Sequence, residues 1–398
     1  MPSLPASPSA GRLVFLDWVR IVAFGLLVLY HVGMYYVSWP WHLKSPHAGT
    51  ALEPWMRMSS PWRLSLLFFV SGAVSAYMLQ TRETGRFLRE RSWRLLLPLA
   101  AGMLVVVPPQ AYLEVVHRHG YEGRYLDFMR LYLGGYRGFC GAGECLILPT
   151  WNHLWFVAYL WLYTVVAWAA LRLAPGWLDR AAARLRPARW GWWSWLVLPV
   201  LAFALLRAAL APRYPSTHAV VADWYNHAQY FACFAAGMVL ARTPDLWTTW
   251  PRWRWPALAC AVLGWALLQH VLTCGPAGGL GCAWRPLAWG MAQWGGLVAL
   301  VGFAARHWHR DGPWRRYLSE AVFPVYVFHQ TVIIVLADAL RPLGWTPVAE
   351  GPALVAGTFA LSLALYEGVR RLPALRPWFG LARRAAQREV ARDASKTA

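Results

Sequence analysis

Acidic residues, and charged residues in general, are scarce in this chain. Only 14% of its 398 residues are charged, and 18 Asp and Glu stand against 38 Lys and Arg. Soluble globular proteins carry about 25% charged residues, so this composition argues against a large soluble core. The formal net charge of +20 could suggest a nucleic-acid partner, but the arginines collect in alternate stretches between apolar segments. That distribution predicts membrane topology and no nucleic-acid binding.

Cysteine is also sparse, with 6 residues in the chain. Cys140 and Cys145 share one stretch between apolar segments, and Cys274 and Cys282 share another. Neither pair has a second CxxC-type partner nearby, which disfavours a zinc site, and we expect no bound metal. If both stretches face an oxidising compartment, two short disulfides are expected; four free thiols are the alternative.

Two other features are missing. No cleavable signal peptide is expected, because the first apolar stretch is too long and contains Asp17, Arg20 and His31. We see no internal repeat of the secondary-transporter kind, and carboxylates within apolar segments are few. Both observations disfavour proton-coupled transport. Export of a small anion or a glycan precursor is nevertheless the alternative function, and a structural role in a glycan assembly complex is a third.

Apolar segments dominate what is present. The chain is 58% hydrophobic, and its 28 Trp residues lie largely near segment ends, as in the aromatic belts of membrane proteins. About ten segments are long enough to cross a bilayer, so we predict an all-α integral membrane protein, a bundle of about ten transmembrane helices. The predicted spans are 14–36, 62–80, 95–114, 151–173, 193–211, 226–241, 257–272, 287–304, 318–339 and 353–369.

The distribution of positive charge orients this bundle. Most of the 38 Lys and Arg residues lie before the first span, in the even-numbered loops and after the last span. The positive-inside rule therefore predicts that both termini are cytoplasmic. We expect a cytoplasmic N-terminal tail at 1–13, a transmembrane domain at 14–369 and a basic cytoplasmic tail at 370–398, with the lipid bilayer as a partner.

Arg20 and His31 lie eleven residues apart in the first apolar segment. Eleven residues are about three helical turns, so both side chains leave one helix face, roughly 16 Å apart along the axis. Such residues persist in a membrane when they face a protein interior or a cavity, and they are functional candidates. A neutral His31 could take a proton from a hydroxyl; a hydrogen bond to another helix is the alternative. Asp17 could pair with Arg20.

Other polar residues suggest a donor site and a cavity. Arg91 and Arg94 are three residues apart beside the third span, and paired guanidinium groups suit phosphates; ordinary positive-inside charge is the alternative. Further polar residues in or beside apolar segments could enclose a polar cavity, although each alone is more often a packing hydrogen bond. These candidates are Ser71, His153, Gln229, His329 and Glu367, with His42 and His47 at an outward-facing mouth.

Several short motifs occur in an order that resembles a known family. FLDWVR with the following YH, FFVSG, RSWRLLLP, HLWFVAYLW and FPVYVFHQ together resemble the membrane acyltransferase family 3, over about residues 15–380. The resemblance implies a ten-helix bundle that moves an acyl group from a cytoplasmic donor to a glycan hydroxyl outside. His31 and Arg20 then correspond to the catalytic Arg-x10-His motif of the family, and Arg91 and Arg94 to its Arg-x2-Arg motif on the donor side.

Two further stretches, WHLKS and ALYEGVRRLP, resemble those members that succinylate periplasmic glucans in the inner membrane of Gram-negative bacteria. This resemblance implies a succinyl or acetyl group, an acyl-CoA-type donor as co-substrate without a bound cofactor, and a glycan acceptor. The stretch 115–150, with its Cys-x4-Cys, departs from the family pattern and leaves the acceptor open.

Overall fold

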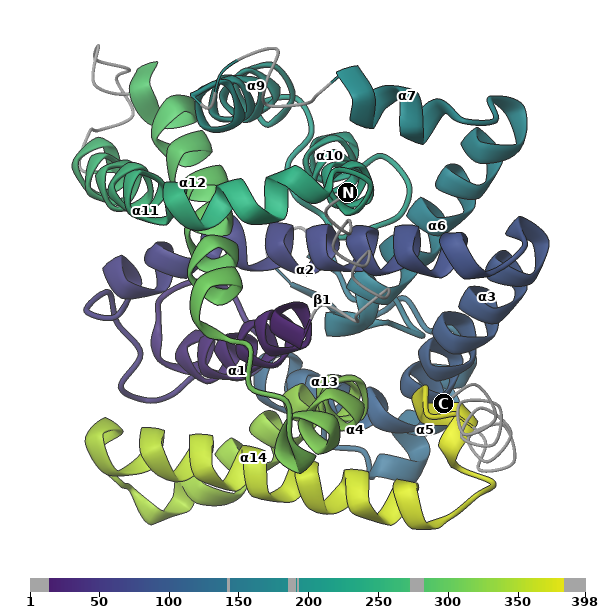
Figure 1. Ribbon diagram of the computed structural model, residues 1–398. Coiled ribbons are helices and arrows are strands. Elements are labelled where there is room, and N and C mark those ends of the chain that lie inside the picture. Colours follow the sequence, from purple (N-terminus) through teal and green to yellow (C-terminus); the bar gives the residue numbers. More distant parts are fainter. Residues whose placement is uncertain (1–13, 142–143, 185–190, 192, 273–282, 383–398) are drawn as a thin grey trace, which may run out of the picture.

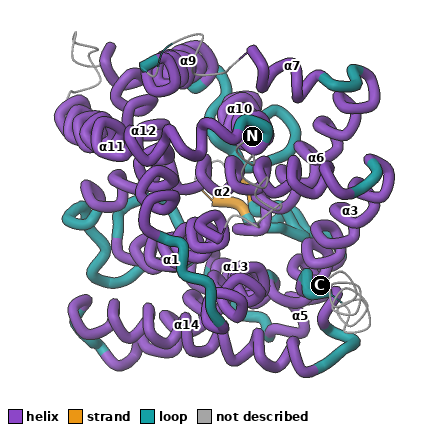
Figure 2. The backbone as a smooth tube through the Cα atoms, viewed as in Figure 1, coloured by secondary structure: helices purple, strands orange, loops and turns teal. Residues whose placement is uncertain are grey.

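The computed structural model describes residues 14–141, 144–184, 191, 193–272 and 283–382. Figure 2 shows that helices make up almost all of this part of the chain, with loops between them and one very short strand pair. The strands β1 (Cys140–Gly141) and β2 (Glu144–Cys145) pair antiparallel, with Cys140 opposite Cys145. The described residues therefore confirm the all-α class.

Each of the ten predicted spans lies in a helix of the structure or, for 95–114, in a bent pair of helices. The long helices are α1 (Val14–Tyr36), α2 (Glu53–Thr81), α3 (Thr84–Ala101), α4 (Pro108–His119), α6 (Trp155–Leu173), α9 (Ser194–Leu210), α10 (Trp224–Ala241), α11 (Pro244–Leu272), α12 (Arg285–His307), α13 (Pro313–Leu340) and α14 (Pro347–Arg371). Shorter elements are α5 (Tyr125–Leu133), α7 (Trp177–Arg184), the π-helical turn η1 (Gly102–Val106) and the 3-10 turns η2 (Asn152–Leu154), η4 (Arg341–Leu343) and η5 (Arg376–Phe379).

By length and composition, six of the described helices can cross a membrane. They are Val14–Tyr36, Glu53–Gln80, Asn152–Leu173, Arg285–His307, Pro313–Leu343 and Pro347–Arg371. The bent pair Thr84–Val106 and Pro108–His119 makes a seventh if it is one span, and Ser194–Leu210 is a shorter apolar helix. The structure thus supports a multi-pass membrane protein, but neither the count of ten spans nor the cytoplasmic side of the termini is confirmed.

The third predicted span is bent because its helix changes type. After α3 the chain forms the π-helical turn η1, in which the Val107 amide donates to the Gly102 carbonyl at 2.8 Å. Pro108 and Pro109 follow, and a proline has no amide hydrogen with which to continue the helical ladder. The two halves therefore meet at an angle of 42°.

Close packing of small residues sets the centre of the bundle. Helix α2 packs against α10 and also contacts α12 (Figure 1). A Cβ atom at Gly72 would overlap the Phe234 carbonyl oxygen, and one at Gly237 would overlap the Phe69 carbonyl oxygen. The two backbones can approach this closely because neither glycine has a side chain. Close helix packing therefore accounts for the glycine of the FFVSG motif.

Helices α1 and α13 pack together and carry matched polar groups. Asp17 forms a buried ion pair with Arg315, which also pairs with Asp311. Arg20 donates from Nη2 to the Ser319 carbonyl at 3.1 Å. Arg315 on α13 is therefore a partner of Asp17, in addition to the pairing with Arg20 that the sequence predicts.

A small lobe follows α4 and covers one end of the bundle. Its aromatic core includes Phe128, Tyr132 and Phe139, and the Tyr132 hydroxyl donates to the carbonyl oxygens of Met103 (2.7 Å) and Thr150 (3.0 Å). Burial raises the pKa of Tyr132, so this hydroxyl is a permanent donor.

The described residues include one of the two expected cysteine pairs. Cys140 and Cys145 form a disulfide, which confirms the first. Cys274 and Cys282 lie outside the described residues.

The segment after α14 returns to the bundle. Arg376 in η5 is buried and bonds to Glu320 at 3.1 Å and to the carbonyl oxygens of Arg370 and Ala382. Phe379 and Leu381 join the main apolar core. Residues 376–381, which follow the predicted end of the transmembrane domain, are therefore packed against it. The predicted tail at 1–13 lies outside the described residues.

Candidate active site

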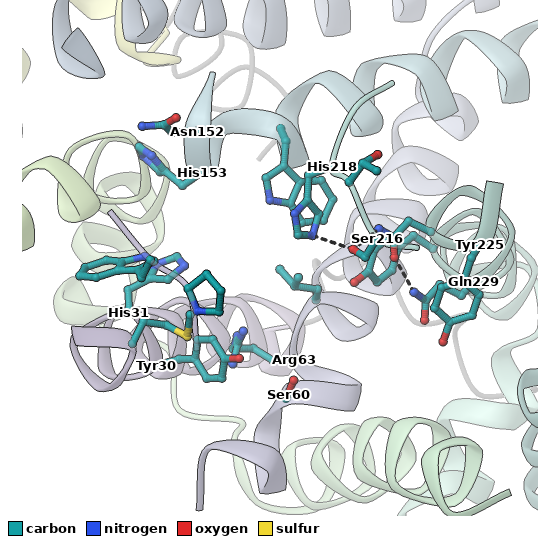
Figure 3. A pocket seen from close by; sticks show the side chains of 18 of the residues that line it. Tyr30, His31, Ser60, Arg63, Asn152, His153, Ser216, His218, Tyr225 and Gln229 are labelled. Atoms are coloured by element: carbon teal, nitrogen blue, oxygen red, sulfur yellow. Dashed lines mark hydrogen bonds between the residues drawn. The ribbon is translucent and has the colours of Figure 1, made fainter. Parts of the chain in front are cut away.

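A cavity of about 690 Å³ lies among the helices, at the end of the bundle that carries the loops 37–52, 134–151 and 212–223. Here it is called the histidine cavity. Figure 3 shows labelled side chains from several helices and loops around it. Its polar lining residues are Tyr30, His31, His42, Ser60, Arg63, Thr150, Asn152, His153, Arg207, Tyr214, Ser216, Thr217, His218, Tyr225, Asn226, Gln229, Tyr230 and Gln330.

His31 reaches this cavity from the second half of α1 and is held by a second histidine behind it. His31 Nδ1 lies 2.7 Å from His329 Nε2, and His329 Nδ1 lies 2.6 Å from the carbonyl oxygen of Tyr326. A carbonyl can only accept, so His329 Nδ1 carries the hydrogen. In neutral His329, Nε2 is then an acceptor, and His31 Nδ1 must be the donor. The tautomer assigned in this way leaves His31 Nε2 with a lone pair, which is the form needed to receive a proton.

A third histidine belongs to the same buried group. His153, 6% exposed, comes from η2 at the start of α6; its Nε2 donates to the Val327 carbonyl at 3.0 Å. Its ring centre lies 5.1 Å from that of His329, edge to face. The Tyr326 hydroxyl in turn donates to the backbone carbonyl of His153 at 2.5 Å. Helices α6 and α13 are therefore locked together around the imidazole pair.

Gln110 is the centre of a buried amide network beside these histidines. It is fully buried; its Oε1 accepts from Asn152 and from Gln330, each at 3.1 Å, and its Nε2 donates to Thr331 at 2.5 Å. These bonds join α4, η2 and α13, and a satisfied polar network of this kind holds its members in one arrangement. The bent third span is thus tied to the cavity wall.

A second polar chain runs from the far wall of the cavity into the bundle. Gln229 Nε2 donates to Asn226 at 2.7 Å, and Gln293 Nε2 donates to Gln229 at 3.0 Å and to Ser65 at 2.8 Å. Asn226 also donates to the Asp223 carboxylate at 2.9 Å. The chain connects α10, α12 and α2, and Figure 3 shows Gln229, Tyr225 and Ser216 on the same side of the cavity.

His218 closes the cavity from the loop before α10. Its ring stacks on Trp155, with ring centres 4.3 Å apart, and its backbone amide donates to Asp223 at 3.0 Å. Burial lowers the pKa of His218 from its ordinary value of 6.5, although the charge of Asp223 acts in the opposite direction. The ring is therefore neutral near pH 7 and adds hydrogen-bonding capacity without charge.

Arginines gather at the opposite end of α1. Arg91 in α3 has two buried nitrogens, Nε and Nη2, without a hydrogen-bond partner, and the charges of both Arg94 and Arg20 act on it. Arg94 is exposed. Arg20, Arg91 and Arg94 are here called the arginine cluster. Paired guanidinium groups with unused N–H donors suit a phosphate-bearing ligand. Among the described residues, no group of three or more His, Cys, Asp and Glu side chains is placed to hold a metal ion.

Comparison with known families gives this arrangement a context. Residues 13–367 match the model of the acyltransferase domain of the acyltransferase 3 family. The chain belongs to the acyltransferase 3 family. It is therefore a membrane acyltransferase that transfers groups other than amino-acyl groups. Neither the curated proteins nor the solved structures gave a match.

The structure of this acyltransferase brings several predicted site residues together. His31, His153 and Gln229 line the histidine cavity, and His329 bonds to His31 directly behind the wall. His42 also lines the cavity and bonds to Glu114 at 2.5 Å, whereas His47 is exposed and lies outside the lining.

Two predicted cavity residues lie elsewhere. Glu367 pairs with Arg370 at 3.0 Å and Arg371 at 3.7 Å on its own helix and does not line the histidine cavity. Ser71 is also outside the lining; its backbone carbonyl accepts from Ser75 on α2 at 2.8 Å. The ion pairs within α14 account for the position of Glu367, and neither side chain lines the histidine cavity.

Sequence reasoning did not single out Arg63, which lines the acyltransferase cavity, or Gln110, which lies beside the cavity histidine His153. Gln110 falls inside the predicted span 95–114, where a single polar residue in PPQAYL gave the only signal. Arg63 was placed at the edge of the span 62–80, where an arginine is ordinary. Helix α2 in fact begins at Glu53, so Arg63 lies well inside it and is 3% exposed.

Proposed function

We propose that this protein is an O-acyltransferase of the bacterial inner membrane. It moves an acyl group, succinyl or acetyl, from a cytoplasmic acyl-CoA-type donor to hydroxyls of a periplasmic glucan or another cell-envelope glycan. One observation carries the proposal: His31, on the wall of a cavity large enough for sugar units, donates through Nδ1 to His329 and keeps Nε2 for a substrate proton.

His31 acts as the general base in this proposal. Its Nε2 takes the proton of a sugar hydroxyl while the hydroxyl oxygen attacks the thioester carbonyl. The new C–O ester bond forms, the C–S bond breaks, and the thiolate takes up the proton as it leaves. Attack by His31 itself, through an acyl-imidazole, is the alternative chemistry. In both, His329 accepts a hydrogen bond from the reacting ring and orients it.

The arginine cluster is the proposed donor site. Arg91 and Arg94 would hold the phosphates of the acyl-CoA-type donor, and Arg20 would orient the donor or stabilise developing negative charge. Arg20 and His31 are roughly 16 Å apart along α1, a distance that an extended pantetheine arm can bridge. The unpaired Nε and Nη2 of Arg91 support this assignment.

The glucan acceptor is the finer part of the proposal. It rests on WHLKS and ALYEGVRRLP, which resemble stretches of glucans biosynthesis protein C. Trp41 and His42 of WHLKS line the histidine cavity, which supports a role for this stretch in acceptor binding. The polar chain through Asn226 and Gln229 offers hydrogen bonds to further hydroxyl groups.

The deciding experiment is mass spectrometry of periplasmic glycans from a strain that lacks the gene and carries the intact gene, His31→Ala or His47→Ala. Loss of a general base typically costs about 10²–10⁴-fold in rate. The intact gene and His47→Ala should restore an acyl mass, which names the acyl group, and His31→Ala should not. Equal restoration by all three would exclude His31 as the base. Thioester consumption by the purified protein separates an acyltransferase from an exporter.

A further inference from the structure

The walls of the histidine cavity carry positive charge without negative charge. The described residues that line it include two arginines, Arg63 and Arg207, and no Asp or Glu. The nearest acids are already bound: Glu114 pairs with His42 at 2.5 Å and Arg118 at 3.0 Å, and Asp223 accepts from Tyr159 at 2.5 Å. The cavity therefore holds cations whose counter-ion is not supplied by the lining.

Arg63 is the most deeply placed of these cations. Its guanidinium carbon lies 3.5 Å from the ring centre of Tyr30, the residue before His31, and Figure 3 shows Arg63 and Tyr30 side by side. Its Nη1 makes a long bond of 3.4 Å to Ser59, and its Nε is buried without a partner. In the described part of the chain no carboxylate lies within ion-pair distance of it, and such a charge inside a membrane protein is costly.

Arg207 provides a second cation on another helix. Its guanidinium carbon lies 3.7 Å from the ring centre of Trp289, and its Nη1 donates to the Tyr225 hydroxyl at 2.8 Å. Stacking on an aromatic face fixes the plane of a guanidinium group and leaves other N–H groups for a ligand. Arg63 from α2 and Arg207 from α9 therefore place two guanidinium groups of fixed orientation in one cavity.

We propose that Arg63 binds an anionic group of the substrate, a carboxylate or a phosphate, beside His31, with Arg207 as a second cation in the same cavity. The proposal rests on the proposed function for the identity of the cavity and adds the charge of its ligand. The anion has two possible sources. It is either the distal carboxylate of a dicarboxylic acyl group such as succinyl, or an acidic substituent on the glycan acceptor.

Binding can be measured without catalysis. The full chain in lipid nanodiscs is titrated with succinate and with inorganic phosphate, and intrinsic Trp fluorescence is followed, since Trp41, Trp151, Trp155 and Trp289 line the cavity. Glucose is the neutral control. The intact chain should bind at least one anion saturably, and Arg63→Gln should weaken that binding about tenfold or more, since a charged hydrogen bond is lost. Arg213→Gln removes an exposed arginine of the outer loop that does not line the cavity and should bind like the intact chain.

Failure to fold must be distinguished from loss of the ligand. Thermal unfolding of each variant in nanodiscs is the check, and Arg63→Lys is the second variant, because it keeps the charge but loses the planar fork. Arg63→Lys should bind the anion more weakly than the intact chain and more tightly than Arg63→Gln. Unaltered binding by folded Arg63→Gln, or no saturable anion binding by the intact chain, would overturn the proposal.

Acyl transfer then identifies the source of the anion. Purified protein is given a periplasmic glycan extract with succinyl-CoA or acetyl-CoA. If Arg63→Gln slows succinyl transfer and spares acetyl transfer, Arg63 holds the acyl carboxylate. If it slows both equally, Arg63 holds an anion of the acceptor, and equal rates in variant and intact chain contradict both. If the intact chain transfers neither group, the proposed function fails, while the anion-binding result stands independently.

Discussion

A pair of stacked imidazoles contains the side chain that we propose to be reactive, His31. The rings of His31 and His329 lie 5.0 Å apart centre to centre, and the Tyr326 carbonyl fixes the hydrogen on His329. One neutral histidine thereby orients the other, the role that a carboxylate has in many hydrolases. Because both partners are neutral, the arrangement avoids placing a carboxylate in the membrane interior.

His329 is therefore expected to be a positioning residue. His329→Phe removes the acceptor for His31 Nδ1 and should lower kcat about tenfold while the KM for the donor changes little. His329→Gln restores an acceptor oxygen and should recover part of the loss. Steady-state kinetics with purified protein measure both. A purely structural role predicts that the two variants lose activity together, in step with their thermal stability.

We expect Arg91 to contribute to binding of the donor more than to the chemical step. Arg91→Ala removes a guanidinium group with two unpaired buried nitrogens and should raise the KM for an acyl-CoA donor by about 10–100-fold. Arg89→Ala, in the same helix and exposed, is the matched control and should leave KM unchanged. Donor titration of thioester consumption is the measurement. If the Arg91 variant has the same KM for the donor as the intact chain, Arg91 does not bind the donor and contributes only to the positive-inside charge.

Individual residues show how far sequence reasoning reaches. His31 and His153 could be found because a titratable side chain in an apolar segment stands out wherever the helix begins or ends. Glu367 could not be placed, because its partners Arg370 and Arg371 lie within one helical turn and take it away from the cavity. Arg63 was missed because its significance depends on where α2 begins, and apolar content alone does not reveal that.

At the scale of elements, the backbones of α2 and α10 approach each other closely at Gly72 and Gly237. Gly72→Ala would place a methyl group on the Phe234 carbonyl, and overpacking of this kind costs about 1–3 kcal/mol. Gly25→Ala in α1 has open space around it and should be neutral or stabilising by up to about 1 kcal/mol. Thermal unfolding in detergent micelles checks the pair. Equal melting temperatures would show that α10 shifts to accommodate the methyl group.

The helices themselves could be located from sequence, but their ends and bends could not. Apolar runs mark the part of a helix that contacts lipid or core, so the predicted centres coincide with α1, α6 and α12. Helix α2 extends beyond its apolar run through polar turns such as EPWMRMSSPW, which carry no hydropathy signal. The break between α3 and α4 combines the Pro108-Pro109 pair, which the sequence shows, with a π-helical turn that side-chain patterns do not encode.

For the whole molecule, sidedness is the property to measure. The charge distribution predicts that the loop with the disulfide is outside and that the Arg91 stretch is inside. A membrane-impermeant maleimide on intact spheroplasts should label Cys140 and Cys145 only after an impermeant reductant, as peptide mapping will show. A cysteine introduced by Arg89→Cys should be labelled only after lysis. The reverse pattern would invert the bundle and place the histidine cavity in the cytoplasm.

The opposed placement of the arginine cluster and the histidine cavity along α1 has an electrical consequence. In the proposed function, an acyl group passes from one to the other and so travels through the membrane field without any transport cycle. If it carries a free carboxylate, one negative charge leaves a negative interior, a movement favoured by up to about 2.3 kcal/mol for each 100 mV. Respiration would then drive succinylation of the cell envelope directly, while transfer of a neutral acetyl group would be indifferent to the membrane potential.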